Sequence, residues 1–137
     1  MSYTIMNNID YKVGIYIRLS REDEEKEKYQ ESESIGNQRT LLMQYIKENK
    51  LNFISEYVDD GVSGTSFDRP AFNRMIADIE SGKINMVITK DLSRLGRNYV
   101  QSGLYIETYF PEHEVRFVAI LDNIDTAYDT SNNDIAP

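Results

Sequence analysis

The chain has 137 residues, of which 40% are hydrophobic, which is typical of one globular domain and not of a disordered chain. It contains no cysteine, so disulfides, thiolate catalysis and thiolate zinc sites are excluded, and a reducing cytoplasm is the expected compartment. No apolar run approaches the ~20 residues of a membrane span, and the polar residues 1–10 do not resemble a signal peptide, so we expect no membrane contact.

The net charge of −8 is concentrated in two peripheral segments. Residues 22–33 hold seven acids and two lysines, and residues 122–137 hold four acids and no base, so the remaining residues carry about +1. Because residues 22–33 are highly charged and poor in apolar side chains, we expect them to form a mobile, solvated acidic loop. A nearly neutral body predicts weak non-specific DNA affinity, since such affinity grows with the number of phosphates neutralised.

Strand-like and helix-like patterns alternate along the chain. Strands are predicted at residues 13–17, 52–58, 84–89 and 115–121. Helices are predicted from Ser32 or Ser34 to about Asn49, from a cap at Asp68 to Gly82, and from about Tyr99 to Phe110, before Pro111. Residues 122–137 show no periodicity and are predicted as loop. This alternation predicts a single α/β domain with three layers, in which a mostly parallel central sheet of four to five strands carries helices on both faces.

Candidate functional side chains follow the first three strands. Tyr16, Arg18 and Ser20 project from one face of the first strand, because side chains alternate along a strand. Since the carboxyl ends of parallel strands meet at one edge, the loops after these strands should bring together one serine and several arginines. The arginines are Arg18, Arg69, Arg94 and Arg97. Like charges gathered at one edge favour an anion, and arginine suits bidentate phosphate recognition, so Ser20 is a candidate nucleophile toward a phosphodiester.

Other interpretations of these residues stay open. Ser20 could cap a helix, with Asp23 three residues on, and Arg18 could be a solvated edge residue in a flavodoxin-like, anion-binding regulatory module without enzymatic activity. A magnesium-dependent nuclease could use Asp59, Asp60 and Asp91. We expect no metal or cofactor, because the arginines would repel a cation, and we expect Asp60 to orient an arginine. His113 is expected to be an ordinary surface residue, which makes a Ser-His-Asp triad unsupported.

Over residues 12–122 the chain resembles the N-terminal catalytic domain of serine recombinases of the resolvase and invertase family, and most of all the large serine recombinases of mobile elements. Four motifs, in order, carry the resemblance. They are Tyr-x-Arg-x-Ser at 16–20, Ser34 with Gln38, Asp60 with Ser63 Gly64 and Arg69 Pro70, and Ser93 to Arg97.

The resemblance implies that Ser20 attacks a DNA phosphodiester, forming a 5′-phosphoserine link and freeing a 3′-hydroxyl, before strand exchange by subunit rotation and religation without metal or ATP. It implies that the four arginines stabilise the transition state and that other residues support the site. The supporting residues would be Tyr16, Gln38, Asp60 and Ser63. Many family members have an aspartate where this chain has Ser93, and Asp91, two residues away, could replace it only with a different loop course.

The family pattern also implies partners. Its members continue into a long helix and DNA-binding domains, bind DNA, and associate into dimers and tetramers. Residues 123–137 are therefore expected to begin a linker, and the 137-residue chain is expected to be a monomer or weak dimer that does not recombine DNA alone.

Overall fold

The structure is a computed structural model in which residues 10–19, 34–60, 69–96 and 98–128 are described. Several residues singled out in the sequence lie outside the described residues. These are Ser20, the acidic segment 22–33, Ser63, Asp68 and Arg97.

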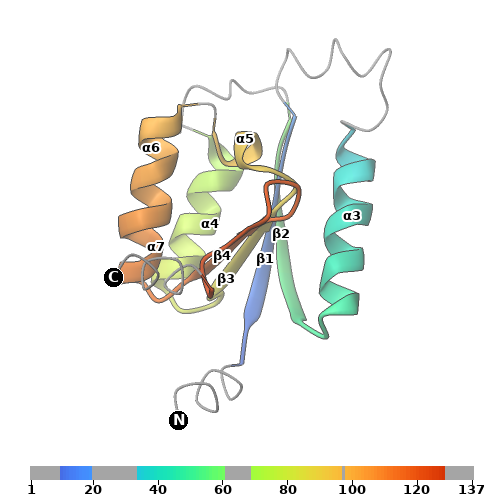
Figure 1. Ribbon diagram of the computed structural model, residues 1–137, viewed down its shortest axis with the longest axis horizontal. Helices are drawn as coiled ribbons and strands as arrows, with labels where there is room; N and C mark the ends of the chain where they lie inside the picture. Colours follow the sequence, from blue (N-terminus) through green and yellow to red (C-terminus); the bar gives the residue numbers. More distant parts are fainter. Residues whose placement is uncertain (1–9, 20–33, 61–68, 97, 129–137) are drawn as a thin grey trace.

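Five strands form one sheet, in the spatial order β2-β1-β3-β4-β5 (Figure 1). The bounds are Lys12–Leu19 for β1, Asn52–Asp60 for β2, Met86–Thr89 for β3, Arg116–Ala119 for β4 and Ile124–Asp125 for β5. The first four strands run parallel, and β5 pairs antiparallel with β4. Because β1, β2 and β3 are parallel neighbours, the chain leaves all three at the same edge of the sheet.

Helices cover both faces of this sheet (Figure 1). Helix α3 (Ile35–Glu48) lies on one face, and α4 (Pro70–Glu80) lies on the other beside a continuous helical segment. That segment consists of α6 (Tyr99–Leu104), the π-helical turn η2 (Tyr105–Tyr109) and α7 (Phe110–Glu112). A single-turn helix, α5 (Leu92–Leu95), follows β3 at its carboxyl end. The three-layer, mostly parallel α/β fold predicted from the sequence is confirmed.

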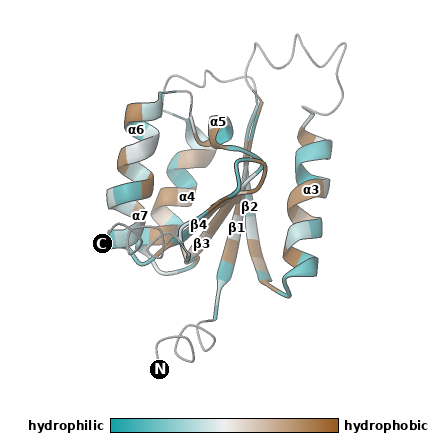
Figure 2. Ribbon diagram, in the orientation of Figure 1, coloured by the Kyte–Doolittle hydropathy of each residue, from teal (hydrophilic) through white to brown (hydrophobic). Residues whose placement is uncertain are grey.

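The alternation of side chains along β1 divides the apolar core in two. Ile15 and Ile17 pack with Leu42 and Ile46 of α3, whereas Tyr16 packs with the cluster on the α4 side. Figure 2 shows the brown, hydrophobic colouring concentrated in the strands and on the helix faces turned toward them. Arg18 has the same parity as Tyr16, so its side chain leaves the sheet on the α4 and α5 side.

Two segments in the C-terminal third of the chain differ from the sequence-based prediction. The helix that begins at Tyr99 does not stop at Phe110 but continues to Glu112, with Pro111 inside its last turn. The preceding turn is π-helical, with the Phe110 amide bonded to the Tyr105 carbonyl, and this wider register precedes a proline that has no amide to donate. Residues 122–137 were expected to be loop, yet they include β5, which is too short to show a strand period.

The start of α4 also differs from the prediction. Arg69, not Asp68, occupies the N-cap position, and its side chain makes no capping hydrogen bond. Within the described ranges, no helix has the length and apolar character needed to cross a membrane.

Candidate active site

Three of the four predicted arginines lie together at the carboxyl edge of the parallel strands. Arg18 is the second-last residue of β1, Arg69 precedes α4 and Arg94 lies on α5; their exposed fractions are 0%, 0% and 3%. Two of them donate to carbonyls of α5: Arg18 Nη2 to Ser93 at 2.7 Å, and Arg69 Nη2 to Leu95 at 2.5 Å. The carbonyls at the end of a helix have no partner within it, so this single turn is a natural acceptor for guanidinium groups.

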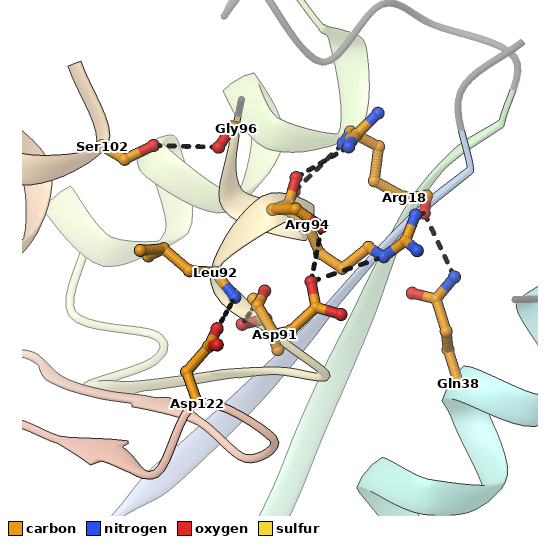
Figure 3. Close-up of polar contacts among 10 residues, drawn as sticks. Arg18, Gln38, Asp91, Leu92, Arg94, Gly96, Ser102 and Asp122 are labelled. Atoms are coloured by element: carbon orange, nitrogen blue, oxygen red, sulfur yellow. Dashed lines mark hydrogen bonds and ion pairs between the residues drawn. The ribbon is translucent and has the colours of Figure 1, made fainter. Parts of the chain in front are cut away.

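Arg94 holds the backbone of β1 in return (Figure 3). Its Nη1 donates to the Arg18 carbonyl at 3.0 Å, and Gln38 Nε2 of α3 donates to the same oxygen at 3.1 Å. Gln38 was predicted at the start of α3 as a supporting residue, and here it is fully buried. Both contacts therefore fix the main chain two residues before Ser20.

Asp59 connects β1, β2 and α4. Its carboxylate accepts hydrogen bonds from the Ala71 and Phe72 amides at 2.9 and 3.0 Å, and from the Tyr16 hydroxyl at 2.8 Å. It thus supplies the capping group that Arg69 lacks at the start of α4. Burial, with the adjacent Asp59 charge, raises the pKa of Tyr16 well above its ordinary value, so the phenol stays protonated as a donor.

Asp60, the supporting residue predicted from the sequence, is exposed at the end of β2, and the buried carboxylate of this strand is that of its neighbour Asp59. Asp59 has the same parity along the strand as Tyr57, which is also buried. That alternation was present in the sequence and could have identified Asp59.

Arg69 is enclosed by aromatic rings. Its guanidinium carbon lies 4.8 Å from the Phe72 ring centroid and 5.5 Å from that of Tyr16, within the range of cation–π attraction. Burial lowers the pKa of Arg69, and the neighbouring Tyr16 and Asp59 oppose that shift. Arginine remains a cation even when its pKa is reduced, so the group presents a fixed positive charge.

Ser93 and Asp91 are in direct contact. The Ser93 hydroxyl donates to Asp91 Oδ1 at 2.6 Å, and the same oxygen lies 3.7 Å from Arg94 Nε. The α5 turn brings residues 91 and 94 onto one side, which is the loop course that the sequence left undefined.

The aspartates and the histidine of the alternative interpretations lie within the part of the chain that the structure describes. There, no group of three or more His, Asp or Glu side chains is arranged to hold a metal ion, and Asp59 is engaged by three donors. His113 is exposed at the end of α7, before β4, and its Nδ1 lies 2.8 Å from the Tyr109 carbonyl. It thus lies toward the amino ends of the strands, opposite the arginines.

Comparison with known proteins points the same way as this geometry. Residues 13–135 match the family model described as "Resolvase, N terminal domain". A Bacillus subtilis (strain 168) protein named "Putative DNA recombinase" is 35% identical over 85 residues, which are 62% of this chain but 16% of that protein. The chain therefore matches a small part of that longer relative.

Two solved structures are similar over most of both chains. The N-terminal catalytic domain of TP901-1 integrase superposes with a TM-score of 0.73 and 29% identity, covering 85% of this chain and 82% of that one. A resolvase family site-specific recombinase from Streptococcus pneumoniae gives a TM-score of 0.68 and 29% identity, covering 85% and 76%.

Proposed function

The chain belongs to the serine recombinase family whose model is described as Resolvase, N terminal domain, and from that membership we propose that it is the catalytic domain of a site-specific DNA recombinase. The observation that supports the proposal is the convergence of Arg18, Arg69 and Arg94 at the edge where β1 ends, and Ser20 is the next residue in the sequence. Buried guanidinium groups in an acidic chain are suited to an anion that carries its charge on several oxygens.

In the proposed reaction the Ser20 hydroxyl attacks the phosphorus of a DNA strand. A bond forms between the serine oxygen and phosphorus, the bond to the 3′-oxygen breaks, and the serine proton is matched by one taken up at the 3′-oxygen. The 3′-hydroxyl of a new partner strand then reverses these steps and releases Ser20. Because the covalent link conserves the phosphodiester bond energy, the cycle needs no ATP, and it needs no metal because the arginines supply the positive charge at the phosphate.

The arginines stabilise the charge that develops on the non-bridging oxygens. Each guanidinium has five N–H donors, so one group can bind a backbone carbonyl and a phosphate oxygen together. Arg18, Arg69 and Arg94 are assigned this role, with Arg97 as the fourth member from the motif. Charge-assisted hydrogen bonds of ~1.5–3 kcal/mol imply that losing one arginine slows cleavage on the order of 10- to 100-fold.

Supporting roles go to residues that hold these groups. Tyr16 and Gln38 do so through the contacts described above. Asp60 and Ser63 are assigned from the motif alone. We further propose that DNA and other copies of the protein are its partners, with dimers and tetramers formed by the full-length recombinase.

The decisive experiment is a covalent adduct assay with the full-length protein carrying this domain. A duplex containing its recombination site, nicked to trap cleavage, is incubated in EDTA and resolved on a denaturing gel. We expect a protein–DNA adduct with the wild type and with the exposed control Ser81→Ala, and none with Ser20→Ala. Cleavage that requires Mg²⁺ would instead indicate a nuclease, and binding without any adduct would indicate a regulatory module.

A further inference from the structure

Asp91 occupies the N-cap position of α5, yet its carboxylate does not cap the helix. Its backbone is extended, with φ −151° and ψ 172°, and its side chain accepts no hydrogen bond from a backbone amide of the first turn. An N-cap aspartate ordinarily accepts an amide two or three residues on. Here the Leu92 amide is bound by the carboxylate of Asp122, which comes from the turn after β4 (Figure 3).

The Asp91 carboxylate is directed instead at Arg94. Oδ1 lies 3.7 Å from Arg94 Nε, and the Ser93 hydroxyl donates to that same oxygen at 2.6 Å. The Asp91 carbonyl accepts from Thr89 Oγ1 at 3.0 Å, which fixes the turn between β3 and α5. The Ser93 hydroxyl thus contacts the Asp91 carboxylate, which faces an almost fully buried guanidinium, while Asp122 binds the helix amide in its place.

We propose that Asp91 is a positioning residue for the recombination reaction, holding the Arg94 guanidinium in place while Ser93 orients the carboxylate. This inference depends on the function proposed above. Through Arg94 Nη1, the contact extends to the Arg18 carbonyl, two residues before Ser20. The departure at position 93 then has a physical explanation, because a hydroxyl at 93 and a carboxylate at 91 act as one unit.

Asp91→Asn tests the charge while retaining the shape of the side chain. The amide cannot neutralise the Arg94 guanidinium, so Arg94 loses the carboxylate that holds it opposite the Arg18 carbonyl. In the covalent adduct assay with the full-length protein, we expect adduct formation to slow on the order of 10- to 100-fold. Glu112→Gln, which removes the same charge from an exposed site on α7, is the matched control and should cleave at the wild-type rate.

A second variant separates positioning from a merely structural role. In Asp91→Asn with Ser93→Asp, a carboxylate returns one residue from Arg94, and the new amide at position 91 can donate to it. We expect this double variant to form the adduct at a rate within about threefold of the wild-type rate, because a charge-assisted contact with Arg94 is restored. Full activity of Asp91→Asn alone, or a double variant as slow as Asp91→Asn, would overturn the proposal.

Nuclear magnetic resonance of the arginine Nε–Hε groups makes the test independent of catalysis. In the 137-residue chain, the Arg94 Nε–Hε signal should move in Asp91→Asn and return toward its wild-type position in the double variant. An unmoved signal would overturn the assignment of Asp91. If the wild-type protein formed no adduct, the proposed recombinase function would fail while this measurement still reported on the contact.

Discussion

At the scale of single residues, Asp59 and Asp60 are neighbours with opposite environments. Asp59 is buried and accepts three hydrogen bonds, whereas Asp60 is exposed. Asp59→Asn replaces one accepting oxygen by a donor that faces donors, so we expect the free energy of unfolding to fall by about 2–4 kcal/mol. Asp60→Asn should change it by less than about 0.5 kcal/mol. Urea denaturation of both variants measures this, and equal losses would contradict the assignment of Asp59 as the cap of α4.

Tyr16, whose hydroxyl donates to Asp59, makes the free energy of unfolding depend on pH in the alkaline range. Its pKa is raised in the folded protein, mainly by burial, while in the unfolded chain it ionises near ~10. The folded state therefore holds the proton that the unfolded state loses, and the resulting stability is present below ~10 and declines as pH rises above it. We expect a loss of up to ~1.4 kcal/mol per pH unit from this residue. Urea denaturation from pH 9 to 11 should show a shallower slope for Tyr16→Phe, and identical slopes would refute the shift.

At the scale of elements, the packing of the Tyr57 and Ile84 side chains against β1 depends on Gly14. The pairing register shifts between Val13 and Gly14, and a Cβ added at Gly14 would lie 2.8 Å from both Ile84 Cδ1 and Tyr57 Cε2. Real Cβ atoms do not approach so closely, so Gly14→Ala should destabilise the protein by about 1–3 kcal/mol. The matched control is Gly36→Ala in α3, where the nearest atom is 4.0 Å away, and thermal unfolding should show no loss there. A Gly14→Ala protein as stable as the control would contradict this packing.

The sequence predicted the long elements well, because their periods extend over many residues. Helix α3 begins after Ser34, whose hydroxyl accepts a hydrogen bond from the Asn37 amide. Ser34 is one of the two caps predicted from the sequence. Elements of two to four residues, such as β5 and α5, contain too few side chains to display a period. The cap of α4 was missed for another reason: Asp59 lies on a different element and becomes a neighbour only when the sheet forms.

The same division applies to the candidate site. The convergence of arginines followed from parallel topology alone, since the carboxyl ends of β1 to β3 share an edge. The partners of those arginines could not be predicted, because they are main-chain carbonyls of α5 and of Arg18 itself. Every residue offers a carbonyl, so no side-chain pattern distinguishes the ones that bind a guanidinium.

At the scale of the whole molecule, the net charge of the chain is negative, opposite in sign to the charge of the arginine cluster. The 137-residue chain carries a net charge of −8, so its overall field repels DNA while the buried guanidinium groups attract a phosphate at short range. We expect no gel shift of duplex DNA by this chain at ~10 μM in about 150 mM salt, where basic proteins bind non-specifically with dissociation constants of ~10⁻⁴–10⁻⁶ M. A shift at ~10 μM or below would contradict this expectation.

The dependence of DNA binding on salt concentration gives a more specific prediction. Ordinary DNA-binding proteins bind more tightly as salt is lowered, because they release counterions from the phosphates. For an acidic chain, lower salt also lengthens the range of the repulsion, to ~30 Å at 0.01 M, so lowering the salt should not produce a shift. Replacing the seven acids of residues 22–33 by their amides would bring the net charge to about −1 and remove most of that repulsion. This variant should bind duplex DNA measurably at low salt, and if it binds no better than the unaltered chain, the acidic segment is not what keeps the domain from DNA.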